Sequence, residues 1–194
     1  MVPTMVFDGH EGPHITSSHN NLLVEEIKVA STLIRRILID TGSSVDIITW
    51  DCLKKLRHLG RKIILLMHPI LGFGGQQLNP MGMIRLPLQF GDKIKALNLE
   101  VDFLIVDVPT TYNIILVRQT LHKVKAIIAS YLLHLQFEAD DGSIGKLQGD
   151  QRMVRECYLV SILPLVARSA GRGPSEPLPL DKKPRTRFLL PSKP

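Results

Sequence analysis

In the stretch "RRILIDTGSSVDIITW", Arg35–Trp50, a short polar segment separates two apolar runs. The first run, Ile37 to Ile39, has the composition of a buried strand and leads directly into Asp40. A carboxylate at the end of a buried strand is unfavourable unless polar neighbours satisfy it. Gly42 permits a sharp turn, and hydroxyl side chains such as that of Ser43 lie within reach. We therefore predict an ordered polar loop that holds Asp40 between two strands.

The composition indicates one ordinary domain with an aliphatic core. The chain has 194 residues, of which 44% are hydrophobic and only 5% aromatic, so Leu, Ile and Val must fill the core. No apolar stretch approaches the roughly 20 residues that cross a bilayer, and the N-terminus lacks the pattern of a signal peptide. Cys52 and Cys157 lie far apart and fit no metal or redox spacing, which favours reduced thiols. We expect no membrane partner and a cytoplasmic location.

The positive charge is concentrated at the C-terminus. Residues 164–194 contain seven basic and two acidic side chains, and so carry +5 of the formal net charge of +6. The same segment holds seven of the thirteen prolines, which favours a disordered tail over an RNA-binding or partner-binding arm. The remainder of the chain is nearly neutral, so nucleic acid is expected to bind weakly through the tail if at all. Residues 1–20 are expected to form a loose N-terminal arm.

Between these ends the pattern predicts a mostly β domain with one or two short helices. Alternating apolar and polar residues indicate strands, and "WDCLKKLRHLG" and "RQTLHKVKA" read as short helices, the first closed by Gly60. The segment "YLLHLQFEADDGSIGKLQG" has the form of a hairpin with "DDG" at its turn. The expected strands are "LLVEEIKVA", "TLIRRILID", "VDIIT", residues 84–90, "LNLEVDFLIVD" and "YNIIL".

Asp40 is the strongest candidate for chemistry. Asp-Thr-Gly after a buried strand resembles the active-site loop of aspartic proteases, in which two carboxylates share one proton because like charges so close cannot both ionise. The alternative is an aspartate that only caps a β-turn. The chain has one such motif, because "DDGS" at Asp140 to Ser143 follows no comparable apolar strand and reads as a hairpin turn. If Asp40 is catalytic, a second copy of the chain must supply the other carboxylate by two-fold symmetry.

Several further segments make the resemblance more specific. "ILIDTGSSVDII", "ILGFGGQQLNPMGMIRLPL", "VDFLIVDVPTTYNIIL" and "GDQRMVRECYLVSIL" occur in this order. Together they resemble the retropepsin segment of plant gypsy-type LTR-retrotransposon Gag-Pol polyproteins, over residues 21–163. The resemblance implies a closed, barrel-like β subunit with a flap hairpin. It also implies a homodimer that cleaves peptide bonds of the element's own polyprotein, within virus-like particles if the element is active.

The resemblance also implies roles for particular residues. Asp40 would be the catalytic acid and base, Thr41 would hydrogen-bond across the dimer, Gly42 would give the carboxylate its backbone approach, and Ser43 would be a nearby donor. The glycine-rich segment would be the flap that closes over the peptide, since glycine adds backbone freedom. A plain turn is the alternative, and a phosphate-binding loop is disfavoured because no Lys-Ser/Thr follows. The flap residues are Gly72, Phe73, Gly74 and Gly75.

One position departs from the family pattern. Val117 stands where the family has a glycine that lets the chain pass close to the active-site loop, and Gln119 stands where proline is usual. A β-branched Val adds bulk and does not readily adopt a positive φ. Arg118 matches the family, where its role is to hold the loop next to the helix. The alternative function is therefore a catalytically inactive remnant with the same fold.

Cofactors are not expected. His10, His14 and His19 are separated by three and four residues, but their Gly, Pro and Ser neighbours give no helix to align them, so a solvated arm is favoured over a metal site. Neither cysteine belongs to a recognisable nucleophile motif, and buried structural thiols are the expectation. We rank a nucleic-acid-binding protein last among the functions.

Overall fold

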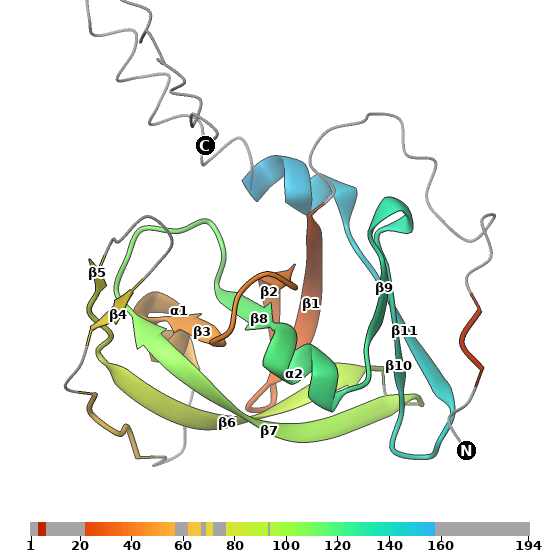
Figure 1. Cartoon of the computed structure of the whole chain (residues 1–194), viewed down its shortest axis with the longest axis horizontal. Coiled ribbons are helices and arrows are strands. Elements are labelled where there is room, and N and C mark those ends of the chain that lie inside the picture. Colours follow the sequence, from red (N-terminus) through yellow and green to blue (C-terminus); the bar gives the residue numbers. More distant parts are fainter. Residues whose placement is uncertain are drawn as a thin grey trace, which may run out of the picture.

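The computed structural model describes residues 4–6, 22–56, 62–66, 69–71, 77–92 and 94–157. The predicted C-terminal tail lies outside these residues, as do the three histidines and all but three residues of the N-terminal arm. The element order shows a mostly β chain with few short helices, which confirms the predicted fold class (Figure 1).

The chain first forms a tight hairpin of strands β1 (Leu23–Val29) and β2 (Thr32–Asp40), which pair in antiparallel orientation. The two turn residues, Ala30 and Ser31, have φ values of 46° and 71°. Positive φ at both central positions gives the turn a twist that matches the right-handed twist of the flanking strands. The two strands predicted around a turn of small residues are confirmed, and the second strand delivers Asp40 to its carboxyl end.

Six strands then close into a barrel in the order β1-β2-β8-β3-β7-β6. The barrel closes where Lys28 and Val29 of β1 pair with Gln89 and Leu88 of β6. Two of the pairings, β2 with β8 and β3 with β7, are parallel. The first of them brings the carboxyl ends of β2 and β8 to the same edge of the barrel. The remaining barrel strands are β3 (Ile47–Thr49), β6 (Gly82–Gly91), β7 (Ala96–Val106) and β8 (Ile114–Val117).

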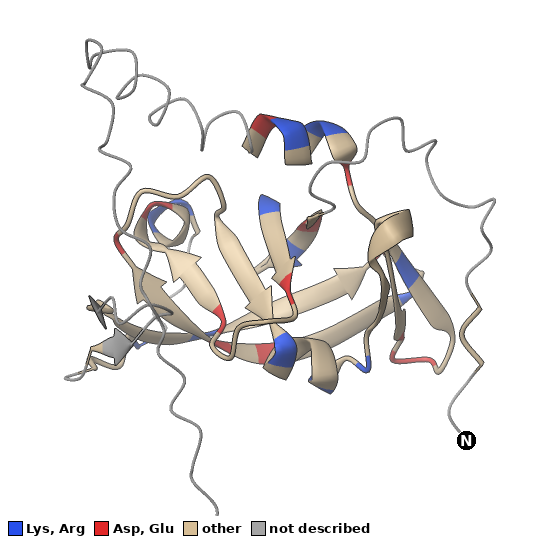
Figure 2. Ribbon diagram, turned by 45° about the horizontal axis from the view of Figure 1, so that its top comes forward, with Lys and Arg blue, Asp and Glu red and all other residues tan. Residues whose placement is uncertain are grey.

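The barrel strands alternate between buried and more exposed side chains. Ile84, Leu86, Leu88 and Phe90 of β6 are buried, as the sequence predicts for a strand with one wet face. Aliphatic side chains dominate the core, and the ring of Phe90 meets that of Phe137 at a centroid distance of 5.7 Å. Basic and acidic residues are interspersed along the described ribbon and are not gathered on one element (Figure 2).

A second sheet packs beside the barrel, in the order β11-β10-β9 (Figure 1). Its hairpin has "DDG" at the turn, as predicted, and Gly142 has a φ of 79°. The Asp140 carboxylate accepts from the backbone and side-chain N–H groups of Asn98, which ties this turn to β7. The strands are β9 (Ile127–Ala129), β10 (His134–Glu138) and β11 (Ile144–Gln148), with a 3-10 turn η2 (Ser130–Leu132) and a helical segment over residues 151–157.

Both predicted helices form, but both are shorter than expected. Helix α1 (Trp50–Lys55) ends where Leu56 adopts extended backbone, so the prediction that Gly60 closes it is wrong. Leu56 is 1% exposed, and burying it in the core draws the chain out of the helix. Helix α2 (Arg118–Lys123) follows β8 directly and ends at Lys123, not at Ala126.

A short antiparallel ladder joins β4 (Ile70–Leu71) to β5 (Gln77–Leu78). It brackets the predicted flap residues Gly72, Phe73, Gly74 and Gly75, which lie outside the described residues.

Candidate active site

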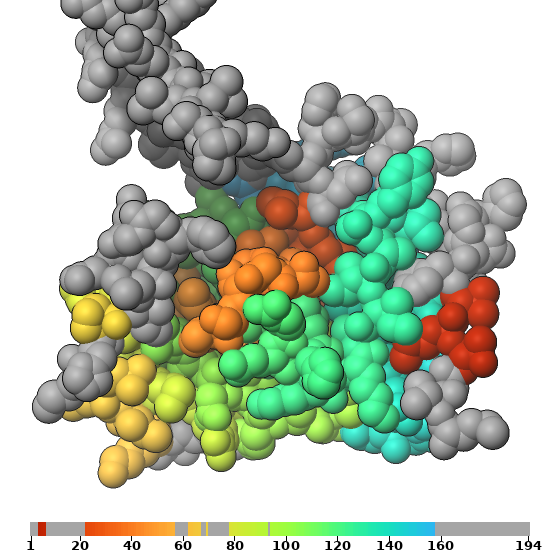
Figure 3. Space-filling model, in the orientation of Figure 1, coloured from red at the N-terminus to blue at the C-terminus, as the bar shows by residue number. Residues whose placement is uncertain are grey.

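Asp40 is the last residue of β2, at the barrel edge where β8 also ends. In the parallel pairing of these strands, Asp40 lies opposite Val117. Its side chain is half-buried, whereas the following residues 41–45 are all exposed. In Figure 3 the loop, in orange, lies on the surface beside the green atoms of α2. The fold therefore presents one carboxylate at the rim of a rigid barrel, accessible to a ligand or to a second chain.

The loop itself hydrogen-bonds both oxygens of Asp40. The backbone N–H of Gly42 donates to Oδ1 at 2.8 Å, and the hydroxyl of Ser43 donates to Oδ2 at 2.6 Å. A Cβ on Gly42 would lie 3.2 Å from Asp40 Oδ1, so a side chain at that position would crowd the carboxylate. Each oxygen retains a lone pair beyond these bonds. The loop thus orients the carboxylate, and both oxygens can still accept a hydrogen bond from a ligand.

Turn capping alone does not distinguish Asp40. Asp141 makes a similar local bond, because its Oδ1 accepts from the N–H of Ser143 at 2.9 Å. Asp92 does the same for the N–H groups of Ile94 and Lys95. These two aspartates lie in exposed turns between adjacent strands, whereas Asp40 lies where two parallel barrel strands end together. "DDGS" is a hairpin turn, as predicted.

Thr41 lines a largely apolar groove of about 510 Å³ between the Asp40 loop and α2. Its rim is basic, and Lys125 there also pairs with Glu138. The groove is open on the single chain, next to the loop that the sequence predicts to form half of a dimeric site. The other lining residues are Arg118, Leu121, His122, Lys125, Ala126 and Ile128.

Val117 is fully buried and adopts φ −116° and ψ 177°, which is ordinary extended backbone. The predicted conflict between a β-branched residue and a positive φ therefore does not arise at this position. The Arg118 side chain is exposed at the start of α2 and forms no hydrogen bond or ion pair with the described residues. The loop-supporting role assigned to it from the family stays a prediction.

Asp46 is a site residue that the sequence reasoning missed. It is 5% exposed and accepts from the Val117 N–H through Oδ1 and from the Thr120 hydroxyl through Oδ2, both at 2.7 Å. Burial raises its pKa, against the opposing effects of these two donors and of Lys123. An aspartate inside the apolar run "VDII" was the available signal, because a buried carboxylate requires partners.

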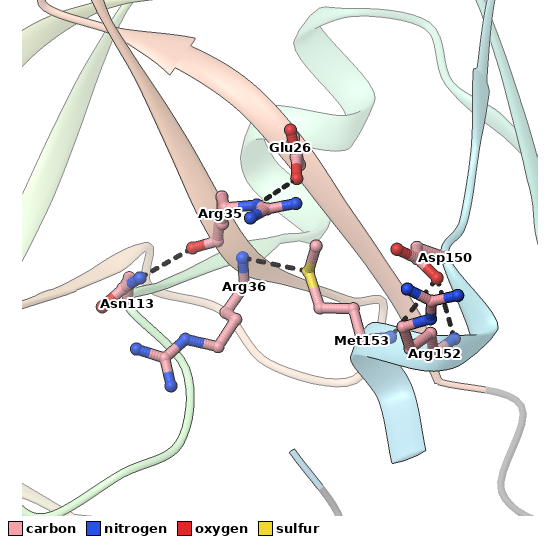
Figure 4. Close-up of polar contacts among 7 residues, drawn as sticks. All are labelled: Glu26, Arg35, Arg36, Asn113, Asp150, Arg152 and Met153. Carbon is pink, nitrogen blue, oxygen red and sulfur yellow. Dashed lines mark hydrogen bonds and ion pairs between the residues drawn. The ribbon is translucent and has the colours of Figure 1, made fainter. Parts of the chain in front are cut away.

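Asn113 fixes β2 upstream of Asp40. Its side-chain amide donates to the Arg35 carbonyl at 2.7 Å and its backbone N–H to the Arg36 carbonyl at 3.0 Å. Arg35 and Arg36 form a β-bulge opposite Glu26, with Arg36 at φ 58° and its N–H directed at Met153 Sδ (Figure 4). A cleft of about 620 Å³ lies at this bulge, but no residue of the Asp40 loop lines it.

No protein-family model matches the sequence, and none of the curated proteins matches it. Among solved structures, the chain is similar to the retroviral protease-like domain of Ddi1 from Leishmania major, with a TM-score of 0.49 and 14% identity over 67% of this chain and 97% of that domain. It is also similar to EIAV protease complexed with the inhibitor HBY-793, with a TM-score of 0.41 and 18% identity over 64% of this chain and 99% of that protein. These likenesses are too distant to assign an activity.

The described residues also bear on metal sites, membrane spans and nucleophilic thiols. They contain no group of three His, Cys, Asp or Glu side chains that could hold a metal ion, and none of their helices is long and apolar enough to cross a membrane. Cys52 and Cys157 are buried free thiols, as expected. Burial raises the pKa of Cys52 to about 11, so it is a poor nucleophile at neutral pH.

Proposed function

We propose that this chain is one subunit of a retropepsin-like aspartic endopeptidase that is active as a homodimer. The observation that carries the proposal is the geometry of Asp40, an accessible carboxylate with both oxygens oriented by its own loop at the rim of a closed barrel. Its place in "ILIDTGSS", between two barrel strands, supports the same conclusion.

Two features support a second copy as the source of the other carboxylate. The loop residues 41–45 are exposed, and the groove beside Thr41 is open. Strand β9 pairs only with β10 within the described part of the chain, and Ile127 on this edge is 47% exposed. An unpaired apolar edge favours association with another chain, and a two-fold axis would place the two Asp40 loops face to face.

The chemistry would be general acid–base hydrolysis. One Asp40 carboxylate takes a proton from a water molecule, whose oxygen attacks the peptide carbonyl carbon, while the protonated Asp40 of the second copy donates to the carbonyl oxygen. The first Asp40 then returns its proton to the leaving nitrogen, the C–N bond breaks, and a hydroxyl of the tetrahedral intermediate returns a proton to the second Asp40 as the new carboxyl group forms. The β4–β5 hairpin would carry the flap that encloses the extended peptide.

The substrate class follows from the sequence resemblance. The linked motifs over residues 21–163 favour a plant gypsy-type Gag-Pol polyprotein as substrate, cleaved in the cytoplasm within virus-like particles. An inactive remnant is the second candidate, favoured by Val117, whose side chain occupies the position opposite Asp40 where the family has glycine.

Cleavage of a peptide library by the purified full chain at mildly acidic pH tests the activity. Asp40→Asn should abolish cleavage, because an amide cannot take the proton. Asp141→Asn is the matched control, since Asp141 also caps a local turn but lies away from the loop, and it should leave cleavage unchanged. Cleavage that survives Asp40→Asn would refute the proposal, and no cleavage by any form would favour the remnant.

A mixing experiment tests the shared site. If each site needs an Asp40 from both chains, a tenfold excess of Asp40→Asn subunits should lower activity per wild-type chain roughly tenfold after subunit exchange. Undiminished activity in the mixture would show that one chain carries a complete site.

A further inference from the structure

The carboxylate of Asp46 connects the end of the Asp40 loop to the start of α2. Asp46 ends the exposed loop that begins after Asp40, and its side chain reaches the first turn of α2. Val117, whose N–H it accepts, is also the residue opposite Asp40 in the β2–β8 pairing. The chain therefore runs from Asp40 through the loop to Asp46, whose carboxylate binds Val117, and Val117 in turn lies opposite Asp40 in the sheet.

The carboxylate of Asp46 matches the hydrogen-bonding groups of its two neighbours. Both neighbours act as donors, one a backbone N–H and the other a hydroxyl, and a carboxylate offers an acceptor oxygen to each. Val117 is the N-cap residue of α2 and has no capping side chain. Its own N–H is one of the backbone donors that the start of a helix leaves unpaired, and Asp46 accepts from it across the sequence. The Asp46 carbonyl also accepts from the Leu104 N–H at 2.8 Å, which fixes its backbone against β7.

We propose that Asp46 is a positioning residue that sets the placement of Asp40 for catalysis by holding the loop end against Val117 and Thr120. This inference rests on the proposed function for its catalytic consequence, but not for its structural one. A displacement of a reacting group by about 1 Å can lower a rate about a hundredfold, so a loose anchor should affect kcat more than substrate binding.

The test compares Asp46→Ala, Asp46→Asn and Thr120→Val with Thr49→Ala in the full chain. Thr49 is a matched control, because it is also buried and caps a helix, accepting from the Cys52 N–H at 3.2 Å, but α1 lies on the other side of β3 from Asp46. All variants are assayed well below their unfolding midpoints, so that each is folded.

Asp46→Ala should lower kcat about a hundredfold with little change in KM. Asp46→Asn should recover most of this loss, because its carbonyl can still accept from Val117 while its amide donates to the Thr120 oxygen. Thr120→Val should fall between these variants, and Thr49→Ala should keep the wild-type kcat. Equal losses of kcat in Asp46→Ala and Thr49→Ala would overturn the proposal.

Amide hydrogen exchange provides a readout that does not require activity. The N–H of Gly42 is held by Asp40 Oδ1, so loosening of the loop should speed its exchange in Asp46→Ala and not in Thr49→Ala. If the wild-type chain cleaves no peptide but the difference in exchange is seen, the proposed protease function is refuted and the structural role of Asp46 is supported. If exchange at Gly42 is the same in both variants, the anchor is refuted whatever the activity.

Discussion

Glu25 and Asp40 are acidic residues on two paired strands of one barrel, yet they differ in burial and in hydrogen bonding. Glu25 lies within β1 and is 4% exposed, and its Oε1 has no hydrogen-bond partner among the described residues. Burial raises its pKa to about 8, and the nearby charges of Asp150 and Glu26 add to the shift. Asp40 lies at a strand end, where its own loop supplies two donors.

The difference shows that burial alone does not mark the reactive carboxylate in this chain. Glu25 lines a small cavity of about 310 Å³ where β1 meets β11, together with Lys146 and Asp150. Position along the strand decides the outcome, because Glu25 Oε1 in mid-strand meets no donor among the described residues, whereas Asp40 at a strand end accepts from the Gly42 N–H of its loop.

The first prediction concerns the pH dependence of stability. The folded pKa of Glu25 lies above its ordinary value of 4.5, so the folded chain holds a proton that the unfolded chain has released. This contribution to stability is fully present below about pH 4.5 and is lost as the pH rises to about 8, by at most about 1.4 kcal/mol per pH unit. Urea unfolding across this range should show the decline.

Glu25→Gln should remove most of this slope, because glutamine stays neutral. Glu156→Gln provides the control, since Glu156 is exposed and its replacement should leave the slope intact. An unchanged slope in Glu25→Gln would show that Glu25 is not the group responsible.

The second prediction concerns the strand residue opposite Asp40. Val117→Gly removes a fully buried side chain and should lower the free energy of unfolding by about 2–3 kcal/mol, with no gain in cleavage. Val108→Gly, at a position that is 41% exposed, should have a smaller effect. A Val117→Gly variant that gains cleavage without losing stability would instead favour the inactive-remnant alternative.

The third prediction concerns the donors to Asp40. Ser43→Ala removes the 2.6 Å bond to Oδ2 and should lower kcat about fivefold, because a hydrogen bond to an accessible carboxylate is partly replaced by water. Ser44→Ala is the natural comparison, since no described contact joins Ser44 to Asp40. Similar rates for the two variants would remove Ser43 from the site.

The smallest expected effect is that of Asp40→Asn on stability. Asparagine keeps an oxygen for the Gly42 N–H, and the site is accessible to water, so the free energy of unfolding should change by less than about 0.5 kcal/mol. Thermal unfolding of the variant measures this directly. A loss of several kcal/mol would instead favour the alternative that Asp40 mainly caps a β-turn.

The sequence alone determined the elements whose signals are local. The sequence predicted the six barrel strands and the hairpin strands β10 and β11, but not β9, and the apolar run before Asp-Thr-Gly located Asp40 at a strand end. These features depend on neighbours within a few positions, and such neighbours are visible in the sequence.

The residues that meet at the site from distant parts of the sequence became visible in the folded barrel. The tertiary structure brought Asp46 to Val117 and Thr120 across more than seventy positions, and it ended α1 at Leu56 because that side chain enters the core. It also showed that Val117 needs no positive φ. Each of these outcomes depends on contacts made when the barrel closes, and no local pattern encodes which strands become neighbours.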